Sequence, residues 1–141
     1  METSVVRKRV SDTIEKAKRQ AAEHRQRADA ATRVYAEFLE TIAVPLFKQI
    51  GNVLKVSGYS FSVFTPSGAV RLMSDRNTED YIELSLDTSG DHPMVLGKSS
   101  RSRGRRVIEH EQAISELTIE HLTEEHVMQY VLKELEPLVD R

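Results

Sequence analysis

Apolar and small residues recur along the first third of the chain at alternating steps of three and four positions. These residues, called the seam below, are interrupted only by His24 and comprise Val10, Ile14, Ala17, Ala21, Ala28, Ala31, Tyr35 and Phe38. This spacing is typical of one face of an amphipathic helix or of a coiled-coil contact. No glycine or proline occurs before Pro45. The pattern predicts one long helix over about residues 4–43, roughly 60 Å in length.

Pro45 predicts the end or a kink of this helix, because proline lacks the backbone N–H that a helix interior requires. A shorter apolar stripe follows, which predicts a second helix docked on the rest of the protein. It consists of Leu46, Phe47, Ile50, Val53 and Leu54. Gly58 marks its end, a few residues late for a regular helix cap.

Beyond residue 58 the apolar positions alternate every second residue, as in strands with one buried face. Residues 59–65 and 69–74 flank the turn residues Pro66, Ser67 and Gly68, and predict a hairpin. Residues 80–87, 94–98 and 105–114 predict three further strands, with Ile82 and Leu84 on one face. The short connections favour an antiparallel meander of about five strands.

A last helix is predicted from Thr123, which is followed by two glutamates, to about Pro137. The fold class is therefore α+β, with a long N-terminal helix, a kinked short helix, the meander and a C-terminal helix. We divide the chain into a helical arm, residues 1–43, for oligomerisation or packing, and an α+β body, residues 44–141.

Charge is unevenly distributed along the chain. Residues 1–58 hold eleven basic and seven acidic side chains, whereas residues 107–141 hold two basic and nine acidic ones. A basic front and an acidic tail attract each other, within one chain or between chains. The chain has no cysteine and no long apolar run, so we expect a cytoplasmic, soluble protein that neither enters nor binds a membrane.

The positions flanking the seam are unsuited to a symmetric zipper, because none of them is acidic and several are basic, among them Lys18, Arg25 and Arg27. Acidic residues four positions before basic ones, as in Asp12 and Lys16, support the helix itself. We therefore expect a homodimer in which the arm of one protomer lies on the acidic tail of the other. The alternative is that the seam packs on the sheet of its own chain.

A basic segment lies at residues 98–106, where five of nine side chains are positive: Lys98, Arg101, Arg103, Arg105 and Arg106. Such a cluster attracts polyanions such as nucleic acid. No aromatic residue lies beside it for base stacking, and the whole chain is slightly acidic. We interpret the segment as a solvated loop between strands, with nucleic-acid binding as a less favoured alternative.

Catalytic and metal-binding motifs are lacking. His121, Glu125 and His126 are close in sequence, but a metal site needs at least three converging ligands, and Thr123 as helix cap places His121 before the helix. His110 alternates in phase with Ile108 and is interpreted as a core or rim residue. The sequence predicts no cofactor and favours a non-enzymatic, self-associating interaction or scaffold module. A ligand-binding or catalytic domain, with a pocket near Phe47 and Tyr59, is the second hypothesis.

Overall fold

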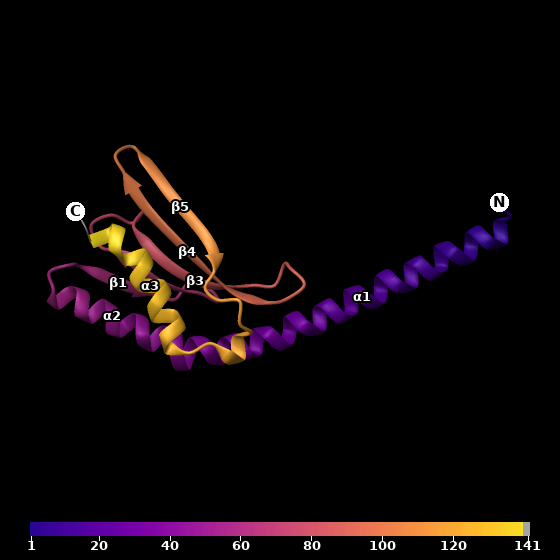
Figure 1. The fold of residues 1–141 in the computed structure, drawn as a ribbon, viewed down its shortest axis with the longest axis horizontal. Coiled ribbons are helices and arrows are strands. Elements are labelled where there is room, and N and C mark those ends of the chain that lie inside the picture. The colour runs from indigo at the N-terminus through magenta and orange to yellow at the C-terminus, as the bar shows by residue number, and fades with distance from the viewer. Residues whose placement is uncertain (140–141) are drawn as a thin grey trace.

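The computed structural model describes residues 1–139. Its elements are α1 (Thr3–Phe38), a π-helical segment (Leu39–Ala43), α2 (Val44–Val56), β1 (Phe61–Phe64), β2 (Val70–Ser74), β3 (Tyr81–Asp87), β4 (Met94–Arg103), β5 (Arg106–Ala113), a 3₁₀ turn (Ile119–His121) and α3 (Glu124–Val139). The strands form one antiparallel sheet in the order β1-β2-β3-β4-β5. The predicted α+β fold is confirmed, and Figure 1 shows α1 projecting far beyond the sheet.

The chain passes from α1 into α2 without a loop. Residues Leu39–Ala43 form a π-helical turn, in which the N–H of Val44 donates to the carbonyl of Leu39, five residues back. This wider turn relieves the crowding that the ring of Pro45 would otherwise cause against the carbonyl four residues before it. The helical path changes direction here (Figure 1), so the predicted kink is confirmed, although the π-helical turn was not foreseen.

Gly58 closes α2 with a regular cap. The N–H of Tyr59 donates to the carbonyl of Leu54, and the N–H of Gly58 donates to that of Lys55. With Gly58 at a φ of +92°, this is the Schellman arrangement that ends many helices. The distance of Gly58 from the last apolar residue is therefore the normal spacing of this cap, and our interpretation of it as late was wrong.

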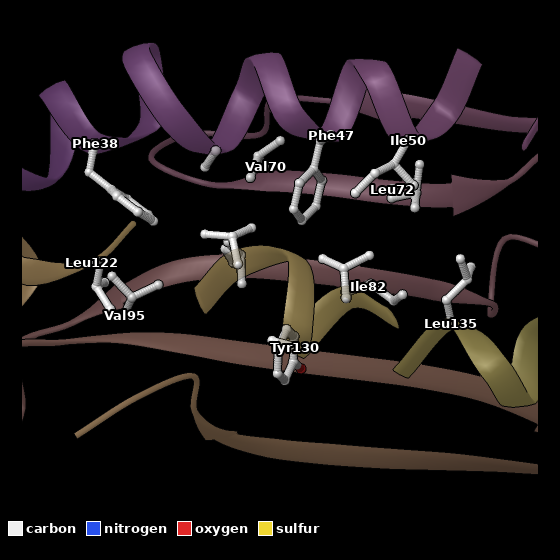
Figure 2. Packing of buried hydrophobic residues seen from close by; sticks show 14 of the residues in the cluster. Phe38, Phe47, Ile50, Val70, Leu72, Ile82, Val95, Leu122, Tyr130 and Leu135 are labelled. Carbon is white, nitrogen blue, oxygen red and sulfur yellow. The ribbon is translucent and has the colours of Figure 1, made fainter. Parts of the chain in front are cut away.

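The core lies between the helices and one face of the sheet. Phe47, Leu72, Ile82 and Leu84 are fully buried, and alternation along β2 and β3 explains why every second residue points to the helices. Figure 2 shows Phe38, Phe47 and Ile50 pointing from the helical layer towards the sheet. The last quarter of α1 belongs to this core, because Ala31, Tyr35 and Phe38 pack in one apolar cluster with residues of α2 and α3.

α3 runs along β4 on the same face of the sheet. Its buried residues follow helical spacing and include Val127, Tyr130, Val131, Leu135 and Leu138. Gly97 of β4 has no side chain, and the ring of Tyr130 occupies the space that a side chain would fill. One turn later the hydroxyl of Ser99 donates to Glu134 Oε2 at 2.9 Å. Two residues of a strand advance about as far as one turn of helix, so the two elements stay in step.

Candidate interaction surfaces

The seam is divided between two environments. Tyr35 is only 3% exposed, and Ala31 and Phe38 are buried with it. Val10 and Ile14 are instead 52% and 48% exposed, and Ala17 and Ala21 are exposed as well. Residues 3–21, called the free arm below, therefore carry the N-terminal half of the seam on a helix that stands clear of the sheet (Figure 1).

Two side chains tie the C-terminal half of the seam to the sheet. The hydroxyl of Tyr35 donates to the carbonyl of Gly68 at 2.8 Å. His24 Nε2 lies 3.0 Å from the carbonyl oxygen of Thr88, and because a carbonyl only accepts, this nitrogen is the donor. The contact with Thr88 marks the point beyond which α1 leaves the body. The alternative that the seam packs on its own chain is thus correct for the part that follows His24.

The free arm has little to stabilise it within its own chain. Among residues 1–139, the acid–base pairs predicted along α1, such as Asp12 with Lys16, do not come within 4.0 Å of each other. An isolated helix of this length is only marginally stable in water. Its exposed apolar residues and its excess of basic side chains are the features available to a partner.

The outer face of α3 carries a stripe of opposite charge. Glu125, Gln129, Leu132 and Glu136 are all exposed and share one face at helical spacing. Leu132, at its centre, is 51% exposed. These four residues are called the acidic stripe below. Asp140 and Arg141, which complete the acidic tail of the sequence, lie outside the described residues.

The basic segment at residues 98–106 is not a loop, contrary to our interpretation. Most of it belongs to β4, and Arg103 pairs with Arg106 across a two-residue turn. Lys98 lies 3.9 Å from Glu111, whereas Arg101 points to the opposite face of the sheet. A hairpin pairs its charges with partner strands and splits them between two faces.

Three arginines remain exposed at the tip of this hairpin: Arg103, Arg105 and Arg106. The tip lies at the end of the molecule away from the free arm (Figure 1). Within the described residues of one chain, these arginines therefore do not form the continuous basic surface with Lys18 or Arg25 that nucleic-acid binding would favour.

A pocket near Phe47 and Tyr59 is not formed as expected, because Phe47 is fully buried in the core. Tyr59 lines a separate cavity of about 220 Å³ together with Arg76, Asn77 and Asp80. The hydroxyl of Tyr59 donates to the carbonyl of Val139 at 3.3 Å, which fastens the end of α3. This cavity is small and open, and its tyrosine has a structural contact.

The histidines just before and within the first turn of α3 make local hydrogen bonds. The N–H of Thr123 donates to Nδ1 of His126 at 3.0 Å, which satisfies a backbone donor ahead of the helix. His121 Nδ1 lies 2.7 Å from the hydroxyl of Thr118. Within residues 1–139 no three histidine, aspartate or glutamate side chains are grouped as metal ligands.

A second cavity, of about 320 Å³, lies between α3 and the β4–β5 hairpin. Its lining includes Arg101, His110, Lys133 and Glu134. We call it the α3–β5 pocket. Lys133 and Glu134 were not predicted from the sequence as pocket residues. The small residues Gly97 and Ser99 on the core side of β4 were a signal that a helix comes close there.

No helix in the described part of the chain has a stretch apolar enough to cross a bilayer. Comparison with protein-family models, curated proteins and solved structures finds no match for this chain.

Proposed function

We propose that this protein is a self-associating interaction module in which the free arm of one protomer packs on the acidic stripe of a second copy. The observation that carries the proposal is the divided seam. Its second half is buried against the body, while Val10 and Ile14 remain exposed on the free arm, which packs on nothing else among residues 1–139. Burying such residues against a partner is the ordinary way to stabilise an amphipathic helix.

The free arm and the acidic stripe match in spacing and in charge. On the arm, Arg7, Val10, Ile14 and Lys18 share one face, with the two basic residues eleven positions apart. On α3, Glu125 and Glu136 are also eleven positions apart, with Leu132 between them. Each stripe therefore spans about 16 Å and has an apolar centre flanked by charges.

Charge also favours the acidic stripe, rather than a second arm, as the surface that the free arm contacts. Two arms packed on each other would bring Lys18 and Arg25 near basic residues of their partner, which is unfavourable. An arm on the acidic stripe instead places opposite charges together at both ends. In a two-fold symmetric dimer the contact occurs twice, which doubles the apolar area buried.

The test is the oligomeric state of the full chain, measured by size-exclusion chromatography with light scattering at micromolar concentration. We expect a dimer, and we expect Val10→Gln with Ile14→Gln to convert it to a monomer. The matched control is Val5→Gln, because Val5 is 39% exposed but lies on the other side of α1. A monomeric wild type, or equal weakening by the control, would rule out the proposed contact.

A further inference from the structure

The α3–β5 pocket exists because the helical layer stops short of the last strand. α3 covers β4 closely, with Tyr130 on Gly97 and Glu134 bonded to Ser99. None of the helices in the described residues covers β5, whose side chains are mostly exposed. His110 and Gln112 of β5 thus face α3 across a gap whose floor is β4.

The chemistry of this pocket is cationic and polar. Arg101 rises from its floor, Lys133 lies on the α3 side, and Glu134 is the single carboxylate in its lining. With His110 neutral, the formal charge of the lining is +1. The carboxylate of Glu134 already accepts a hydrogen bond from Ser99, which holds it towards β4. The remaining cationic donors are those of Arg101 and Lys133.

Arg101 has an unusual environment for an arginine of this sheet. Its Nε is buried and has no hydrogen-bond partner among residues 1–139. Arg71, two strands away, is fully engaged by contrast, because its Nη2 lies 2.9 Å from Glu83 and its Nε donates to the same carboxylate. A buried charged donor left without an acceptor is costly, so nearly all such groups in proteins are satisfied.

From this geometry we infer that the α3–β5 pocket binds a small molecule through an anionic oxygen group, a carboxylate or a phosphate, with Arg101 as the principal donor. The guanidinium presents N–H groups in a fork that matches both anions, and Lys133 adds a point charge at the entrance. Glu134 keeps free acceptor positions, which favour a ligand that also carries a hydroxyl or amino group. The volume of about 320 Å³ limits the ligand to a small metabolite.

This inference is independent of self-association. Glu134 lies nine residues after Glu125 and therefore on the opposite side of α3 from the acidic stripe. A second copy bound at the stripe leaves the pocket side of α3 facing β5.

The experiment is an NMR titration of the full-length protein with inorganic phosphate and, separately, with malonate, at constant ionic strength set with chloride. The Nε–H resonance of Arg101 is one reporter, because this group is buried. The backbone amide resonances of Ser99 and Ser100, which line the pocket, are a second reporter that is also present in Arg101 variants. We expect a saturable shift at millimolar concentration with at least one anion. The anion that binds more tightly identifies the group recognised, phosphate or carboxylate.

Variants separate a specific site from general charge attraction. Arg101→Gln should weaken binding by about tenfold or more, the size of one lost hydrogen bond to a charged group. Lys133→Gln, on the exposed side of α3, should weaken it by a smaller factor without affecting the fold. Arg105→Gln, at the exposed hairpin turn, is the matched control and should bind as the wild type does. The absence of a saturable shift with either anion would overturn the inference. Equal affinity of the wild type, Arg101→Gln and Lys133→Gln for the anion would overturn it as well.

Discussion

The ring of Tyr130 rests directly on the backbone of Gly97. A Cβ atom placed on Gly97 would lie 2.3 Å from Tyr130 Cζ and 2.6 Å from its hydroxyl oxygen, far inside van der Waals contact. Tyr130 is itself buried between α3 and the sheet. This contact sets how closely α3 approaches β4, and it therefore sets the depth of the α3–β5 pocket.

Replacing Gly97 by alanine should destabilise the protein, because the methyl group forces the tyrosine ring and α3 away from the sheet. Overpacking of this kind costs about 1–3 kcal/mol. The free energy of unfolding, measured by urea denaturation, checks it. Gly90→Ala is the control, since no atom lies within 4 Å of its added Cβ. Equal stability of the two variants would contradict the close contact.

Tyr35 should make the protein less stable in alkaline solution. Burial, followed by the nearby Glu83, raises the pKa of Tyr35 above its ordinary value of 10.0. The folded state therefore keeps the proton that the unfolded state releases, so the contribution of Tyr35 is complete below about pH 10 and is lost as the pH rises further. Burial and then Glu134 act on the pKa of Tyr130 in the same direction.

Tyr35→Phe isolates this effect. At pH 7 the variant should be less stable by about 1 kcal/mol, because the hydrogen bond to the carbonyl of Gly68 is lost. From about pH 8 to pH 11 the gap in stability between wild type and variant should stay constant up to about pH 10, the ordinary pKa of tyrosine, and should then narrow. Urea denaturation over this range is the measurement, and a gap that stays constant would be inconsistent with a raised pKa of Tyr35.

Exchanging charges between the free arm and the acidic stripe should identify the partner surface. Lys18→Glu should weaken dimerisation, and adding Glu136→Lys or Glu125→Lys should restore it, since each exchange recreates an opposite pair. The exchange that rescues also sets the direction of the arm, parallel to α3 for Glu136 and antiparallel for Glu125. Dimer dissociation constants from sedimentation, at low and high salt, are the readout.

The wild-type dimer should dissociate more readily as salt is added, because the attraction is between exposed charges. If Val10→Gln with Ile14→Gln abolishes the dimer but neither charge exchange rescues Lys18→Glu, the arm is an interface whose partner surface is not the acidic stripe.

Arg71 should stabilise the face of the sheet that points away from the helices. Its guanidinium carbon lies 4.2 Å from the centre of the Tyr81 ring, and Nη2 lies 2.9 Å from Glu83. Arg71→Gln removes both contacts and should cost about 1–2 kcal/mol. Arg76→Gln, at an exposed position, should change stability by no more than about 0.5 kcal/mol. Thermal unfolding compares them, and equal melting temperatures would mean that the Arg71 contacts contribute nothing measurable.

Much of the fold could be predicted from periodicity alone. The helix over the seam and the alternation of Ile82 with Leu84 follow from the spacing of apolar residues, which is a local property of the chain. The extent of β4 could not be found in this way. The predicted strand ended at Lys98, whereas β4 continues to Arg103. This extension is held by cross-strand pairs such as Arg101 with Ile108, and such partners are identified only once the hairpin has formed.

One local signal for that hairpin was present. Gly104 has a φ of +65° and occupies the first central position of the turn between Arg103 and Arg106, as in a type II′ hairpin turn. For the α3–β5 pocket the signal was indirect, since the small residues Gly97 and Ser99 indicate only that a helix comes close to β4. Arg101 and Lys133 are brought together only because Tyr130 seats α3 on Gly97, a contact between segments distant in sequence.

The direct passage from α1 through Leu39–Ala43 into α2 has a mechanical consequence. A flexible tether would let the N-terminal helix swing, whereas here its heading is set by the same hydrogen-bonded turns that hold Phe47 beneath the sheet. Once a partner stabilises it as a helix, the free arm extends about 28 Å from the body. A partner bound at the far end of the arm is then held at a defined distance and angle from the sheet.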